Sequence, residues 1–348
     1  MSEIFSPIFR TRTIALYAFL ALLNIGGWIW ALIAFHEKPL LLGTAFLAYT
    51  FGLRHAVDAD HIAAIDNVTR KLIQENKRPV SVGFFFSLGH STIVVIASLI
   101  VYLAASAVEK QMDVVKEIGG MIGTLVSALF LITIAIINIL ILRGVWSTFQ
   151  RVRKGGDYID QGSDMLSGAG VLSSIFRPLF RMLSSPWHMY PIGLLFGLGF
   201  DTATEVAILG ISAAAATSGL TVETMAVFPL LFTAGMTLVD TTDGILMVGA
   251  YGWAFIKPIR KLYYNLTITF VSVVVALLIG GIEALGLLKD RLNLNGGGWD
   301  FVSSLNNNFG TVGFIIIGVF VLSWIGSAII YRVKDFDRFE SSNRITID

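Results

Sequence analysis

Long apolar runs separated by short polar connections dominate the chain. A run of about 20 apolar residues is long enough to cross a bilayer as a helix. The pattern predicts eight such helices, near residues 13–35, 40–64, 81–107, 118–142, 188–217, 224–252, 263–288 and 309–331. Strands of a membrane barrel are shorter and alternate in polarity. The sequence therefore predicts an all-α, polytopic membrane protein, and the first run is too long for a signal-peptide core, so we expect it to be retained.

Composition supports a membrane protein and excludes several functions. The chain is 55% hydrophobic and 14% charged, whereas soluble domains are about 25% charged. Its 25 basic and 24 acidic residues form no basic surface for nucleic acid, so membrane lipid is the expected surroundings. The chain has no cysteine, which excludes disulfides, thiolate metal sites and cysteine nucleophiles.

The distribution of basic residues predicts the orientation. Lys and Arg gather at the N-terminus, in the connections after the second, fourth and sixth runs, and in the C-terminal tail; the opposite connections hold only Lys38, Lys110, Lys116, Lys289 and Arg291. Because cytoplasmic loops carry the excess of Lys and Arg, both termini should be cytoplasmic and the protein should lie in the cell (cytoplasmic) membrane. We interpret residues 1–348 as one transmembrane domain, in which 143–187 is a cytoplasmic linker. The chain has no phosphate-binding loop, so it encodes no nucleotide-hydrolysing motor.

Polar side chains interrupt four of the apolar runs. They are Arg54, His55, Asp58, Asp60 and His61 in the second run, Ser87, His90 and Ser91 in the third, Asp201, Thr202, Thr204 and Glu205 in the fifth, and Thr237, Asp240 and Asp243 in the sixth. Six unpaired carboxylates facing lipid would cost on the order of 15–20 kcal/mol. They must face one another, water or a cation; hydrogen bonding between helices is the alternative explanation. Glu283 lies near the end of the seventh run, which favours exposure to solvent.

Spacing within the second run predicts a distorted helix. His55, Asp58 and His61 share an arc of about 120°, but residues 55 and 61 are about 9 Å apart along an ideal helix axis. One ion reaches both residues only if the helix is locally unwound, and Gly52 just upstream favours a break. In a regular helix, Asp60 would instead lie behind the ligands or pair with a basic residue. We expect Arg54 to balance neighbouring carboxylates.

Imidazole and carboxylate groups together suit divalent nickel, cobalt, zinc, copper or iron. A site made of carboxylates alone would suit calcium or magnesium better. The sequence therefore predicts a transition-metal site with His55, Asp58, Asp60, His61 and His90 as candidate ligands. The polar residues of the fifth and sixth runs, with Ser87 and Ser91, are expected to line a transport path.

Four segments resemble signatures of the nickel/cobalt transporter (NiCoT) family. They are RHAVDADHI at 54–62, FSLGHSTIV at 86–94, LGFDTATE at 198–205 and GMTLVDTTD at 235–243. They occur in the family's order, within the second, third, fifth and sixth runs. The resemblance also covers the eight-helix layout and the cytoplasmic termini.

The resemblance implies high-affinity uptake of Ni²⁺ or Co²⁺ by a single polypeptide that needs neither ATP hydrolysis nor an ATPase partner. The ion is then a substrate, no permanent cofactor is expected, and the protein is not an enzyme. The family's H-x4-D-H element falls on His55, Asp60 and His61, and Asn24 best matches a polar residue of the first span. Metal preference in the family varies with the residue at Val57, which does not identify one metal here.

Three alternatives stay open from the residues themselves. They are an efflux permease or channel, a transporter for another divalent transition metal, and a membrane-embedded metalloenzyme; the last is disfavoured because the chain lacks H-E-x-x-H and has only five histidines. The tripeptide Phe51-Gly52-Leu53 before the second run's acidic cluster is repeated as Phe196-Gly197-Leu198 before the fifth run's. Those helices should run in opposite directions, so the match reflects either an inverted repeat or chance.

Overall fold

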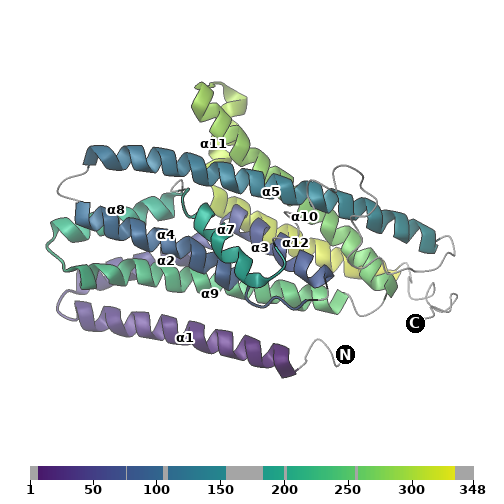
Figure 1. Ribbon diagram of the computed structural model, residues 1–348, viewed down its shortest axis with the longest axis horizontal. Helices are drawn as coiled ribbons and strands as arrows, with labels where there is room; N and C mark the ends of the chain where they lie inside the picture. The colour runs from purple at the N-terminus through teal and green to yellow at the C-terminus, as the bar shows by residue number, and fades with distance from the viewer. Residues whose placement is uncertain are drawn as a thin grey trace.

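The computed structural model describes residues 7–75, 77–104, 109–153, 183–199, 202–254 and 258–333, and every regular element in these ranges is a helix. Most helices run along the long axis of the molecule, whereas α11 stands out to one side (Figure 1). The elements are α1 (Pro7–Phe35), α2 (Pro39–His55), α3 (Ala59–Gln74), α4 (Val82–Ala104), α5 (Glu109–Arg153), the 3-10 turn η2 (Pro186–His188), α7 (Met189–Phe196), α8 (Ala203–Thr217), α9 (Val222–Ala254), α10 (Pro258–Leu292), α11 (Gly297–Asn306) and α12 (Phe309–Val333).

Six of these helices are long and apolar enough to cross a membrane: α1, α4, α5, α9, α10 and α12. The α2–α3 pair makes a seventh candidate if it counts as one bent span, and α8 is a shorter apolar helix. The expected all-α, polytopic membrane architecture is therefore confirmed. The count of eight crossings stays a prediction.

The predicted distortion of the second span is confirmed. α2 ends at His55, α3 begins at Ala59, and the two axes differ by 51°. Three residues make the break, the last of which, Asp58, is extended at ψ 146° and caps α3. The break brings His55 and His61 to the same level of the fold, which a continuous helix would not do.

The fifth apolar run was expected to be one helix, and this expectation is wrong. α7 ends at Phe196 and α8 begins at Ala203, where extended Thr202 accepts a hydrogen bond from the Glu205 N–H at 3.4 Å. Gly197 and Gly199 disfavour helix at this point, and threonine is a good N-terminal cap. These local signals favour a second break over continuity.

The segment expected as a linker is described only in part. Its first residues, 143–153, continue α5, and 183–187 lead into η2 and α7. Residues 154–182 lie outside the described part of the chain. In the connection expected between the last two spans, the structure has a further helix, α11, which the pattern did not predict.

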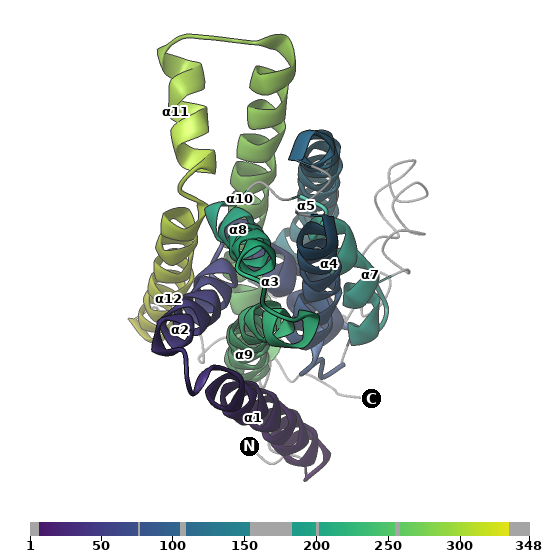
Figure 2. The same ribbon diagram turned by 90° about the vertical axis from the view of Figure 1, so that its left-hand side faces the viewer.

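Glycines bring two pairs of helices into backbone contact. A Cβ on Gly52 of α2 would overlap the Phe232 carbonyl of α9, and one on Gly193 of α7 would overlap the Phe86 carbonyl of α4. α4 and α9 also contact each other, so the two broken helices flank a central pair (Figure 2). The sequence predicted close approach at Gly193 and Gly197, and the contact of Gly197 with the His90 backbone confirms it.

Replacing Gly52 with Ala should destabilise the protein, because the added methyl group has no space against α9. Overpacking of this kind typically costs about 1–3 kcal/mol. Gly43→Ala on the same helix is the matched control, because a Cβ there meets no atom within 4 Å. Thermal unfolding of the purified protein in detergent should show a lower Tm for Gly52→Ala only; equal Tm values would contradict the packing.

Candidate metal centre

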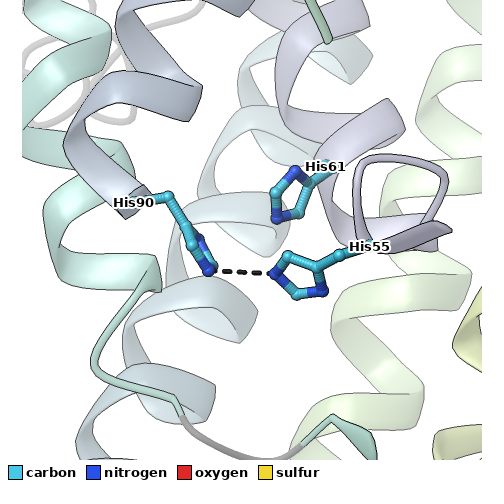
Figure 3. A group of neighbouring side chains, drawn as sticks. All are labelled: His55, His61 and His90. Carbon is cyan, nitrogen blue, oxygen red and sulfur yellow. Dashed lines mark hydrogen bonds between the residues drawn. The ribbon is translucent and has the colours of Figure 1, made fainter. Parts of the chain in front are cut away.

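Three imidazole rings from three helices meet at the break between α2 and α3. His55 is the last residue of α2, His61 lies in the first turn of α3, and His90 lies in the middle of α4. Their ring centroids are 4.7, 4.8 and 4.9 Å apart, which is nearly an equilateral triangle. All three are buried, and Figure 3 shows the rings turned toward one another. The structure therefore brings together three histidines from the second and third apolar runs.

Glu205, in the first turn of α8, completes this cluster. Its Oε1 lies 2.9 Å from His90 Nε2 and 3.8 Å from His55 Nε2, while the two Nε2 atoms are 2.9 Å apart. Metal–imidazole bonds are about 2.0–2.1 Å long, so two ligands at right angles around one ion are about 3 Å apart. The donor spacing therefore matches ligands that share one metal ion.

Carboxylates contact two of the imidazole rings at Nδ1, on the side away from the centre of the cluster. His55 Nδ1 lies 2.9 Å from Asp58 Oδ2, and His61 Nδ1 lies 3.1 Å from Asp240 Oδ2. Such carboxylate–histidine pairs fix the tautomer and the orientation of metal-binding imidazoles. With Nδ1–H donating to the carboxylate, each ring presents the lone pair of its Nε2 to the centre of the cluster.

Hydroxyl groups add a further layer of contacts. Thr202 and Thr204 place their Oγ1 atoms 3.4 and 3.3 Å from His55 Nδ1, and Thr202 also donates to Glu205 Oε2 at 2.9 Å. On the α4–α9 side, Ser87 donates to Asp240. These bonds tie the orienting groups to α8 and to α4.

Several buried polar atoms have no hydrogen-bond partner among the described residues. They include His61 Nε2 and His90 Nδ1 of the triad, Asp60 Oδ1, Ser91 Oγ and Asp243 Oδ2. An unpaired buried polar atom costs about 1–3 kcal/mol. His61 Nε2, on a ring that lies beside two other imidazoles, is therefore available to bind a cation.

The remaining predicted residues lie at different distances from the triad. Asn24 joins α1 to its neighbours: it accepts from the Tyr49 hydroxyl at 3.0 Å and donates to the Ala234 carbonyl at 3.4 Å. Thr237 donates to the Thr233 carbonyl within α9. Arg54 is exposed beside Asp58, whereas Asp201 lies outside the described residues.

Two aromatic contacts of the histidines were not predicted from the sequence, and one glutamate that was expected to be exposed is buried. Phe86 packs edge-on against His61 at 4.8 Å, and Phe232 lies 5.6 Å from His55. Nothing in their spacing distinguishes them from other core aromatics. Glu283, expected to be exposed, is 3% exposed and accepts from Ser127 at 2.8 Å, because α5 packs along α10 there.

Comparison with known proteins agrees with this chemistry. The family model described as NicO, high-affinity nickel-transport protein, matches residues 41–330. A high-affinity nickel transport protein of Cupriavidus necator is 56% identical over 95% of both chains. The nickel transporter NixA of Staphylococcus aureus is 42% identical over 93% of this chain and 94% of its own. The cobalt transport protein NhlF of Rhodococcus rhodochrous is 40% identical over 84% of each chain.

No solved structure matches the chain. The family model covers most of the sequence and all three histidines of the cluster. The chain belongs to the NicO family of high-affinity nickel-transport proteins.

Proposed function

We propose that the protein is a secondary transporter that takes up Ni²⁺, Co²⁺ or both. The observation that carries the proposal is the buried His55–His61–His90 cluster, closed by Glu205, where two broken helices meet. Transporters commonly bind ions at discontinuous helices near the middle of the membrane. The names of the relatives support nickel and cobalt as the ions.

The proposed topology has eight crossings, with α2–α3 and α7–α8 each forming one broken span. Both termini and the 143–187 segment are cytoplasmic, as the basic residues indicate, and the membrane is the cell membrane. The packing also supports an inverted repeat. The broken span α2–α3 is followed by α4, which contacts α7, and the broken span α7–α8 is followed by α9, which contacts α2. The site then lies between the two repeats.

The site residues take distinct roles in this proposal. His55, His61 and His90 are the imidazole ligands, and Glu205 is the carboxylate ligand, while Asp58 and Asp240 orient the rings. Asp60, which the family resemblance assigns to metal recognition, adds negative charge in the first turn of α3. Surplus carboxylate around neutral imidazoles favours a dication in a medium of low dielectric constant.

The onward path follows α9. Asp243 lies one turn beyond Asp240 toward the proposed cytoplasmic end, and its Oδ2 is buried without a hydrogen-bond partner among the described residues. The inside-negative membrane potential supplies about 4.6 kcal/mol per 100 mV for a dication. That energy can drive accumulation without an ATPase partner.

Accumulation of radioactive ⁶³Ni and ⁵⁷Co in cells that express the protein tests this function. Expressing cells should gain metal faster than vector controls, and an uncoupler that collapses the membrane potential should lower the rate. An efflux protein would instead lower the cell's metal content. Rates equal to the vector control for both metals, with the protein present in the membrane, would refute the proposal.

A further inference from the structure

We propose that the cavity between α2, α8 and the α11–α12 corner is the outer mouth of the metal path, through which the hydrated dication reaches His55. The inference rests on the proposed function and adds an entrance to it, in which Asn306 and Asn307 of the α11–α12 corner join residues of the motif segments. The cavity has a volume of about 500 Å³. Its floor is formed by Asp58, Thr202 and Thr204, which all contact His55 Nδ1.

The lining of the cavity is that of a water-filled space. Arg54, within the second apolar run, is exposed and lines it together with Asn306 and Asn307. An arginine in contact with lipid at the middle of a span costs about 2.5–3.5 kcal/mol, so its exposed face must be toward water. Six waters occupy about 180 Å³ in the liquid, so the cavity holds an ion with its first hydration shell.

Glycines at the start of α12 let this helix pack closely against the residues of the cavity floor. A Cβ on Gly310 would lie 3.2 Å from Asp58 Oδ1 and 3.3 Å from Arg54 Nε. A Cβ on Gly313 would overlap the Val57 carbonyl, so α12 packs directly on the break between α2 and α3. Figure 2 shows α8 near the start of α12, with α11 rising next to α10, and residues of α2, α8 and α12 line the cavity together. The start of α12 thus forms one wall of the mouth and lies directly beside Asp58 and Arg54.

On the other side of the triad the packing is closed. His61 and Asp240 are fully buried, and Phe86 lies against the His61 ring. Further along α3, Arg70 donates to Asn67, which also accepts from Asn138 at 2.6 Å. Within the described part of the chain, an ion therefore has access to the histidines from the side of α8 and α12. The connection before α12 has few basic residues, which places that side outside the cell.

The absence of cysteine from the chain allows a direct test. Asn307→Cys and Ala207→Cys place a thiol on two different elements that line the cavity, the α11–α12 corner and α8. Asn295→Cys places one on the same connection as Asn307, where it is exposed and does not line the cavity. Intact cells are treated with the membrane-impermeant, cationic thiol reagent MTSET, and ⁶³Ni uptake is compared with that of the same variant left untreated. A fixed positive charge in the mouth should slow uptake by about tenfold or more, since charge in a cleft alters on-rates by 10–10³-fold.

The expected result is inhibition of both cavity variants from outside and no inhibition of Asn295→Cys. Three results would contradict the proposed mouth. The cavity cysteines would fail to react with MTSET, as thiols facing lipid do; they would react only in inside-out vesicles; or they would react without any loss of uptake. Failure of the proposed function is distinguishable, because wild-type cells would then accumulate no metal before any reagent is added. If one of the two cavity variants transports no metal before treatment, the other variant still tests the proposed mouth.

Discussion

Replacing His55, His61 or His90 singly with Ala is expected to reduce Ni²⁺ uptake at least about 100-fold, since even residues that only orient metal ligands typically account for 10–100-fold in affinity. Each substitution removes one of three imidazoles that lie within 5 Å of one another. The remaining groups cannot move in to replace it, because the helices around them are in backbone contact at Gly52 and Gly193. Initial rates of ⁶³Ni accumulation, normalised to the amount of protein in the membrane, measure the effect.

His36→Ala is the matched control for this series. The His36 side chain is 71% exposed and pairs with Glu37, far from the triad in the fold. It should transport at the wild-type rate. A triad variant with wild-type uptake, or a His36 variant as impaired as the triad variants, would contradict the assigned site.

Replacing Glu205 with Gln is expected to weaken Ni²⁺ binding by about a thousandfold. The substitution keeps the shape and one carbonyl oxygen, but it removes the negative charge beside His90 and His55. Two unit charges 4 Å apart interact by about 4 kcal/mol at an effective dielectric constant of 20, which corresponds to roughly three orders of magnitude in affinity. Titration of the purified protein with Ni²⁺ in a calorimeter measures the dissociation constant.

Glu223→Gln tests whether any loss of negative charge has the same effect. Glu223 lies in the first turn of α9 and is exposed. Its substitution should leave the affinity unchanged. Equal affinities for Glu205→Gln and the wild type would show that the carboxylate at α8 does not bind the ion.

The sequence predicted the all-α membrane architecture for a physical reason, and the same reason singled out the buried histidines. Apolar length identifies spanning helices because the bilayer has a fixed thickness, and imidazoles in such a run are costly unless they have a function. The distortion between His55 and His61 followed from the same reasoning, because 9 Å of ideal helix would hold the two rings apart. These predictions depend on local geometry that one segment specifies by itself.

Contacts between segments were harder to predict. Glu205 was placed on the path, but nothing in its own helix shows that it lies 2.9 Å from His90. The break between α7 and α8 was missed, because the apolar residues on both sides of it were interpreted as one continuous helix, although Gly197, Gly199 and Thr202 favour a break. The burial of Glu283 depends on Ser127 of another helix, and the α11–α12 corner carries no motif. Tertiary packing determines the contact of Glu205 with His90 and the burial of Glu283, and one sequence does not display this packing.

The coordination shell of bound nickel shows whether the histidine cluster holds the transported ion. X-ray absorption at the nickel edge, on purified protein loaded with one equivalent of Ni²⁺, reports the ligand types and their distances. We expect about three imidazole ligands at about 2.1 Å, with oxygen ligands in the remaining positions, and the loss of one imidazole in His61→Ala. A shell of oxygen ligands alone, or a spectrum unchanged by His61→Ala, would contradict this expectation.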